Sequence, residues 1–144
     1  MQVPSRARAV IIGGGVVGCS IAYHLGKLGW RDVVLLERKQ LTCGTTWHAA
    51  GLIAQLRATQ NMTRLAKYSQ ELYFGLEAET GVATGFKRNG SITVALTDER
   101  MEELRRSAAM ARAFGVEIDE ITPSDIGSQY PGLMTDDVVG GVWL

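Results

Sequence analysis

The stretch "AVIIGGGVVG", residues 9–18, decides the fold that this chain is expected to adopt. Its first four residues are apolar and mostly β-branched, which is typical of a short buried strand. The remaining six satisfy the pattern G-x-G-x-x-G. Apolar residues then recur at helical spacing as far as Gly26 and Gly29, which are expected to end a helix. The glycine-rich pattern therefore lies at a predicted turn between a strand and a helix.

A second apolar run, "DVVLLE" at residues 32–37, predicts another strand, and the whole forms the βαβ context in which the glycine pattern indicates dinucleotide binding. In such a unit Gly13 permits the tight turn, Gly15 lets a pyrophosphate approach the backbone, and Gly18 lets the helix pack close to the strand. The helix N-terminus offers N–H groups to the phosphates. Glu37 can accept hydrogen bonds from ribose hydroxyls, and its charge disfavours the 2′-phosphate of NADP.

The segment that follows the second strand indicates which dinucleotide is bound. "RKQLTCGTTWHAAGLIAQLR", residues 38–57, reads as a loop of small and hydroxyl-bearing residues rather than as another strand–helix unit. Its N–H groups and hydroxyls can cradle further phosphate oxygens and the edge of a flat ring. On chemical grounds this favours FAD slightly over NAD, and an NAD-dependent enzyme stays open as an alternative.

Composition and charge exclude several other classes of protein. Hydrophobic residues make up 46% and charged residues 21% of the 144, the balance of a globular domain rather than of a disordered chain. Lys+Arg and Asp+Glu number 15 each, so no basic surface is predicted for nucleic acid or for an anionic membrane. Cys19 and Cys43 show neither metal-ligand spacing nor a disulfide framework. No metal site is therefore expected, and a reducing compartment fits best.

The amino end resembles a secretory signal peptide only superficially. Arg6 and Arg8 precede an apolar run, but four glycines interrupt this run. It is also shorter than the roughly 20 apolar residues that span a bilayer. No secretory leader or membrane segment is predicted, so the expected location is the cytoplasm of a bacterium, or the mitochondrial matrix if the protein is eukaryotic and a leader has been removed.

Three segments, "VIIGGGVVGCSIAYHLGKLG", "VVLLER" and above all "LTCGTTWHAAGL", resemble the sarcosine and dimethylglycine dehydrogenase family of D-amino-acid-oxidase-like flavoproteins. The resemblance continues through "LEAETGVATGFKRNGSITVA" and fades toward the carboxyl end. In that family the histidine of the T-T-W-H-A-A-G stretch is bonded through a ring nitrogen to the flavin 8α carbon, and the matching residue is His48. Cys43 departs mildly from the family, which more often has serine or alanine there.

The resemblance implies a set of cofactor-binding residues, with His48 as the covalent attachment point and Trp47 packed near the ring or against the core. Residue chemistry alone favours a loop histidine bonded to backbone beside noncovalent FAD, and the resemblance reverses this preference. The predicted set is Gly13, Gly15, Val16, Val17, Gly18, Glu37, Arg38, Gly44, Thr45, Thr46, Trp47, His48, Ala49, Ala50, Gly51 and Leu52. No catalytic residue is assigned, because the residues that grip the substrate are expected beyond Leu144.

The activity that the resemblance implies is FAD-dependent oxidative N-demethylation of a methylated glycine. The expected partners are a small N-methylated amino acid and an electron-transfer flavoprotein, with tetrahydrofolate as a one-carbon acceptor in the full-length protein. Two alternatives stay open within the same family. One is a noncatalytic regulatory subunit like that of pyruvate dehydrogenase phosphatase, which the Trp47–His48 pair disfavours. The other is an amine oxidase that uses oxygen.

Further helices and strands are predicted downstream. The expected helices are 61–80, stopped by Gly81, then 98–115, with Asp98 as N-cap and Gly115 as C-cap, and one that begins near Pro123 and ends before Pro131; the expected strands are 91–96, a short one after residue 115, and 138–144. The fold class is therefore α/β, a Rossmann-like FAD-binding βαβ unit with the start of an α+β substrate domain. Residues 1–58 are expected to begin the FAD-binding domain, and residues 59–144 to form a helical segment and the start of the substrate side.

The chain is also expected to be an amino-terminal fragment, because members of the family continue for several hundred residues. Such a fragment should leave a strand of a sheet unpaired and apolar faces exposed. No turnover is expected from the fragment alone.

Overall fold

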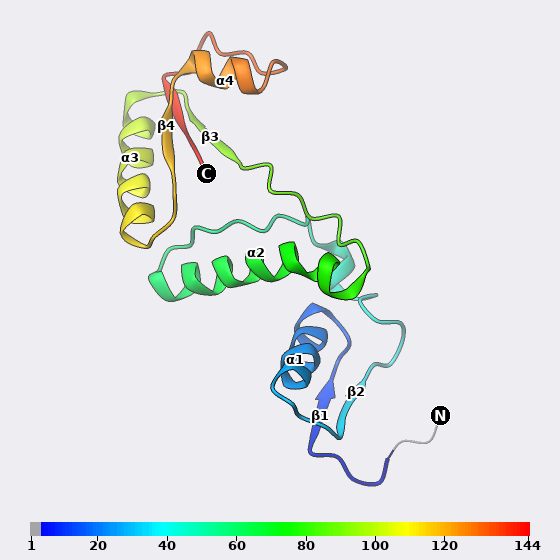
Figure 1. Cartoon of the computed structure of the whole chain (residues 1–144). Coiled ribbons are helices and arrows are strands. Elements are labelled where there is room, and N and C mark those ends of the chain that lie inside the picture. The colour runs from blue at the N-terminus through cyan, green and yellow to red at the C-terminus, as the bar shows by residue number, and fades with distance from the viewer. Residues whose placement is uncertain (1–3) are drawn as a thin grey trace. The chain divides into compact units, whose positions relative to one another are not determined.

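The computed structural model describes residues 4–144, and the chain divides after Leu52 into two compact units. Each unit is described separately, with the labels of Figure 1. The mixed helix and strand content agrees with the predicted α/β class. None of the helices in the described part of the chain is both long and apolar enough to cross a membrane.

The amino-terminal unit is a single βαβ motif. It consists of β1 (Ala9–Ile12), α1 (Val16–Lys27) and β2 (Val33–Leu36). The two strands run parallel with Ile12 opposite Leu36, which requires a crossover connection such as α1. The strands and the helix predicted on either side of the glycine pattern are thereby confirmed.

The end of α1 differs in detail from the prediction. The helix continues past Gly26 to Lys27, and Gly29 follows with φ +77°, a left-handed conformation in which glycine is unstrained. Gly26 therefore lies inside the helix, and only Gly29 helps to end it. The reason is that a single glycine lowers helix stability by only about 1 kcal/mol, which is too little to stop a helix that packs against two strands.

The apolar face of this unit is only partly covered by its own chain. Ile11 is buried, whereas Ile12 is 87% exposed and Val17 is 69% exposed. A sheet of two strands and one helix is too small to bury all of its apolar side chains.

The carboxyl-terminal unit begins with a loop, which is followed by α2 (Gln60–Thr80). The hydroxyl of Thr59 accepts a hydrogen bond from the N–H of Met62 and caps this helix, and Gly81 ends it with φ +72°. The helix predicted over residues 61–80 and its stop at Gly81 are confirmed.

A three-stranded antiparallel sheet follows, with the order β3 (Ile92–Ala95), β5 (Gly140–Trp143) and β4 (Asp119–Ile121). The remaining helices are α3 (Asp98–Ala113) and α4 (Pro123–Gln129). Helix α3 packs against the sheet and supplies much of the core, whose buried members are Ala95, Met101, Leu104, Ala108, Ala111, Val116, Ile118 and Val142. Val116 and Ile118, expected to lie in a strand, pack into this core just before β4 begins.

The cap of α3 corrects one prediction. Thr97, rather than Asp98, is the N-cap, because its backbone is still extended and its hydroxyl accepts a hydrogen bond from the N–H of Arg100. Asp98 is the first helical residue and places its charge at the positive end of the helix dipole. At the other end Phe114 is the C-cap, and Gly115 follows with φ +71°.

Candidate cofactor site

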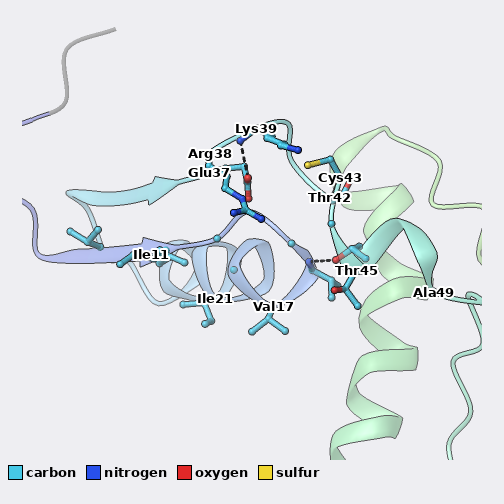
Figure 2. A pocket seen from close by; sticks show the side chains of 18 of the residues that line it. Ile11, Val17, Ile21, Glu37, Arg38, Lys39, Thr42, Cys43, Thr45 and Ala49 are labelled. Atoms are coloured by element: carbon cyan, nitrogen blue, oxygen red, sulfur yellow. Dashed lines mark hydrogen bonds between the residues drawn. The ribbon is translucent and has the colours of Figure 1, made fainter.

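The amino-terminal unit contains a cavity of about 890 Å³ at the carboxyl end of β1 and the first turn of α1 (Figure 2). This volume lies within the range of about 300–1,000 Å³ that is usual for small-molecule sites. The predicted cofactor residues that line the cavity are Gly13, Gly15, Val16, Val17, Gly18, Glu37, Arg38, Gly44, Thr45, Thr46 and Ala49. The glycine pattern, the acid after β2 and the small-residue loop therefore meet at one place.

The other residues of the predicted set, Trp47, His48, Ala50, Gly51 and Leu52, do not line this cavity. The sequence interpretation missed several residues that do, which are Ala9, Val10, Ile11, Ile12, Ile21, Leu25, Lys39, Thr42 and Cys43. Most of these are apolar residues of β1 and α1. The apolar run of β1 and the helical spacing of α1 predict core residues, and the same pattern could have placed one face of each element at the cavity wall.

The glycine loop has the geometry that the pattern requires. Gly13 has φ +105°, which other residues rarely adopt. A Cβ atom on Gly18 would lie 1.8 Å from the carbonyl oxygen of Gly13, far inside any allowed contact. Close approach of α1 to the end of β1 therefore depends on glycine at residue 18.

The first turn of α1 presents N–H groups toward the cavity. A helix leaves its first four N–H groups without intrahelical partners, and here these belong to Gly15, Val16, Val17 and Gly18. The N–H of Val16 donates to the hydroxyl of Thr46 at 2.9 Å (Figure 2). The first turn of α1 contains no acidic residue, so the positive end of the helix dipole is available to an anionic phosphate.

Glu37 is held by backbone at both carboxylate oxygens. One oxygen accepts from the N–H of Gly14 at 2.8 Å. The other accepts from the N–H of Lys39 at 2.9 Å, a contact that Figure 2 shows. These hydrogen bonds, first that from Gly14, lower the pKa of Glu37 below its ordinary value of 4.5. The carboxylate thus connects the glycine loop to the end of β2, and these two hydrogen bonds are called the Glu37 brace below. Each oxygen keeps a lone pair for a further donor.

The stability of the protein at acid pH should depend on this brace. Since the pKa of Glu37 is lowered in the folded chain, its contribution is complete above the unfolded value near 4.5 and is lost as the pH falls through the lower folded pKa. We expect Glu37→Gln to lower the Tm at neutral pH, because the amide NH₂ cannot accept from an N–H, and the difference from wild type to shrink as the pH drops below about 4.5. Thermal unfolding across the acid range measures this difference.

Glu117→Gln is the matched control for this prediction. Glu117 is exposed in the other unit and makes no hydrogen bond in the described part of the chain, so its replacement should leave the Tm unchanged at every pH. A Glu37→Gln variant whose Tm follows wild type at neutral pH would show that the brace contributes nothing.

The histidine singled out by sequence lies in a short 3₁₀ turn, η1 (Thr45–His48). Its ring stands edge to face with the indole of Trp47, with ring centroids 5.6 Å apart and an angle of 61° between the planes. Both side chains are exposed, Trp47 to 72%. The Trp47–His48 pair therefore stands on the surface of the amino-terminal unit, where a large ligand could contact it.

The two cysteines are free thiols in different surroundings. The Sγ of Cys19 donates to the carbonyl oxygen of Gly14 at 3.5 Å, and Cys43 is exposed in the loop that lines the cavity. Among residues 4–144 no group of three or more His, Cys, Asp or Glu side chains is arranged to hold a metal ion.

The parallel βαβ unit, the glycine loop and the acid after β2 define a dinucleotide-binding protein with a Rossmann-like fold. The model of the FAD dependent oxidoreductase family matches residues 8–144, and the chain belongs to that family. The crystal structure of L-proline dehydrogenase from P. horikoshii superimposes with a TM-score of 0.89 at 30% sequence identity, covering 98% of this chain and 37% of that one. The predicted Rossmann-like fold is thereby confirmed.

Three mitochondrial proteins are similar to almost the whole chain. Dimethylglycine dehydrogenase of Rattus norvegicus is 44% identical over 96% of this chain, and sarcosine dehydrogenase of Mus musculus is 41% identical over 99%. The pyruvate dehydrogenase phosphatase regulatory subunit of Mus musculus is 39% identical over 100%. The predicted resemblance to the sarcosine and dimethylglycine dehydrogenases is confirmed. The chain spans 16% of the length of each of these relatives.

Proposed function

We propose that the cavity beside α1 holds FAD through the predicted cofactor residues. The observation that carries this proposal is that the glycine loop, Glu37 and Thr46 line a single cavity in a chain of an FAD-dependent family. The N–H groups at the start of α1 suit the pyrophosphate, and Glu37 suits the ribose hydroxyls of the adenosine half. The residues present thus fit FAD, which can accept a hydride when it is bound.

The small-residue loop is the second part of the proposed site. Residues 44–52 would contact the flavin half, with backbone N–H groups and hydroxyls kept accessible by Gly44 and Gly51. Gly51 has φ +76°, so the chain can turn sharply three residues after the end of η1. On this proposal residues 1–58 are the first part of the FAD-binding domain, and residues 59–144 begin the substrate side.

Covalent attachment through His48 is part of the proposal. An exposed imidazole on a short turn can reach a ligand without first leaving a buried core. Attachment joins a ring nitrogen of His48 to the 8α carbon of FAD. The hydrogens of the N–H and of one C–H leave as two protons and two electrons, which dioxygen accepts to give hydrogen peroxide.

For the protein in its full length, the proposed reaction is oxidative N-demethylation of a small N-methylated amino acid such as sarcosine or dimethylglycine. Similarity to dehydrogenases named for these two compounds supports this substrate class. An electron-transfer flavoprotein as acceptor and tetrahydrofolate as one-carbon acceptor complete the proposal. The proposed location is the bacterial cytoplasm, or the mitochondrial matrix in a eukaryote.

Anaerobic titration of the full-length protein tests this function. We expect sarcosine or dimethylglycine to bleach the flavin absorption band, because a hydride from the N-methyl carbon reduces the bound FAD. Glycine, which lacks the methyl group, and NADH should leave the band unchanged. Purified protein that shows no flavin absorption band would favour the NAD-dependent alternative.

Two other outcomes separate the alternatives within the family. Bound FAD that no methylated amine reduces would favour a regulatory subunit, to which the similarity with the pyruvate dehydrogenase phosphatase subunit also points. Rapid oxygen consumption during turnover would favour an oxidase over a dehydrogenase. The Trp47–His48 pair weighs against the regulatory alternative, since attachment of flavin has no evident use in a noncatalytic subunit.

A further inference from the structure

One hydrogen bond connects the start of α1 to the turn that carries His48. The N–H of Val16 donates to the hydroxyl of Thr46 at 2.9 Å, across thirty residues of chain. The N-cap residue of α1 is Gly15, which has no side chain with which to cap the helix. Thr46 therefore pairs, from η1, one of the N–H groups that a helix leaves without an intrahelical partner.

Gly15 leaves the space that this contact needs. A Cβ atom on Gly15 would lie 3.1 Å from the hydroxyl oxygen of Thr46, which is tighter than ordinary contact. Glycine at residue 15 thus leaves room for Thr46 at the helix end and keeps the backbone accessible to a phosphate. A second bond, from the N–H of Thr42 to the carbonyl oxygen of Gly14 at 2.8 Å, holds the same loop against the glycine turn.

Thr46 is also fixed to the turn on its other side. Its carbonyl oxygen accepts from the N–H of Ala49 at 3.2 Å, and this bond closes the turn around Trp47 and His48. The hydroxyl of Thr46 accepts from Val16 and still has its own proton, which it can donate to an anion at the helix end. The phosphate end of the cavity and the imidazole of His48 are therefore joined through one residue.

We propose that Thr46 is a positioning residue, which holds η1 against the start of α1 so that His48 lies where the flavin is attached. This inference rests on the proposed function, since it requires FAD in the cavity and attachment at His48. In this role Thr46 acts by holding η1 in place, and not by contacting the cofactor itself. Loss of the hydroxyl should slow attachment even when the cavity is saturated with FAD.

Thr93 provides a control outside the proposed site. It is exposed on β3, does not line the cavity, and its hydroxyl forms no hydrogen bond in the described part of the chain. Thr93→Val therefore removes the same chemical group without releasing η1 from α1. Thr46→Val keeps the shape of the side chain and removes the acceptor, whereas Thr46→Ser keeps the acceptor.

The test follows covalent attachment in full-length apoprotein mixed with increasing FAD. Samples are denatured in acid at intervals, and flavin fluorescence that stays with the protein is measured. We expect the limiting rate at saturating FAD to fall about tenfold in Thr46→Val, to return in Thr46→Ser, and to match wild type in Thr93→Val. A residue that only contacts FAD would raise the half-saturating concentration and leave the limiting rate unchanged.

The possible results separate this inference from the proposed function. An unchanged limiting rate in Thr46→Val, or an equal fall in Thr93→Val, would overturn the inference while flavin binding stands. Wild-type protein that binds no FAD would overturn both. If Thr46→Val does not fold, as judged by circular dichroism, Thr46→Ala takes its place, with the same expected tenfold fall.

Discussion

Replacing Gly18 by alanine is expected to unfold the amino-terminal unit or to abolish its flavin binding. The added Cβ would lie 1.8 Å from the carbonyl oxygen of Gly13, and a backbone atom cannot rotate away as a side chain can. Overpacking costs about 1–3 kcal/mol where side chains can adjust, so at this rigid contact we expect at least about 3 kcal/mol. Domains are stable by only about 5–15 kcal/mol, so such a loss is large. Urea unfolding and the flavin content of purified protein measure it.

Gly26→Ala is the matched control, because Gly26 lies on the same helix. Nothing lies within 4 Å of the Cβ that it would add. Alanine is favoured over glycine inside a helix by about 1 kcal/mol, so this variant should be as stable as wild type or slightly more so. If Gly18→Ala behaved in the same way as Gly26→Ala, the close approach of α1 to β1 would be wrong, and with it the basis for a phosphate site at this turn.

The sequence was sufficient for the βαβ unit because its signals are local. A run of β-branched residues, glycines at fixed spacing and a helical repeat each act within a few residues, and β1, α1 and β2 formed where these patterns predicted them. The same holds for α2, whose end is marked by Gly81.

The contacts that the sequence could not predict join residues far apart in the chain. The bond from Val16 to Thr46 spans thirty residues, and that from Gly14 to Glu37 spans 23. No spacing rule links such pairs, because the path of the loop between them decides which groups meet. The error at the start of α3 has a different cause. Thr97 and Asp98 are both good capping residues, and only the extent of the preceding extended backbone selects the threonine.

The site shows the same division between local and long-range information. The motif located His48, and the structure adds that the imidazole is exposed on a short turn tied to α1 through Thr46. Whether this imidazole becomes bonded to flavin depends on where the bound ligand lies, which is set by long-range contacts and not by a local sequence pattern. A single substitution is therefore the most direct test of its role.

His48→Ala is expected to remove all covalent flavin while leaving FAD bound, because the glycine loop and Glu37 that suit the adenosine half remain unchanged. After acid denaturation and electrophoresis, wild-type protein should carry flavin fluorescence in its band and the variant should release its flavin. His24→Gln is one control, since His24 lies within α1 and its ring is hydrogen-bonded to the carbonyl oxygen of Ser20. Cys43→Ser is the other, because Cys43 is an exposed thiol on the cavity wall.

The fluorescence of these variants tests each of the three residues as the attachment point. Fluorescence lost only in His48→Ala would place the bond at His48, and loss only in Cys43→Ser would move it to the thiol. Retention of fluorescence in all three would exclude each of these residues. The flavin potential gives an independent measure, since a substituent at the 8α carbon withdraws electron density from the ring. We therefore expect a lower potential in His48→Ala than in wild type, and an equal potential would mean that the wild-type flavin is not substituted there.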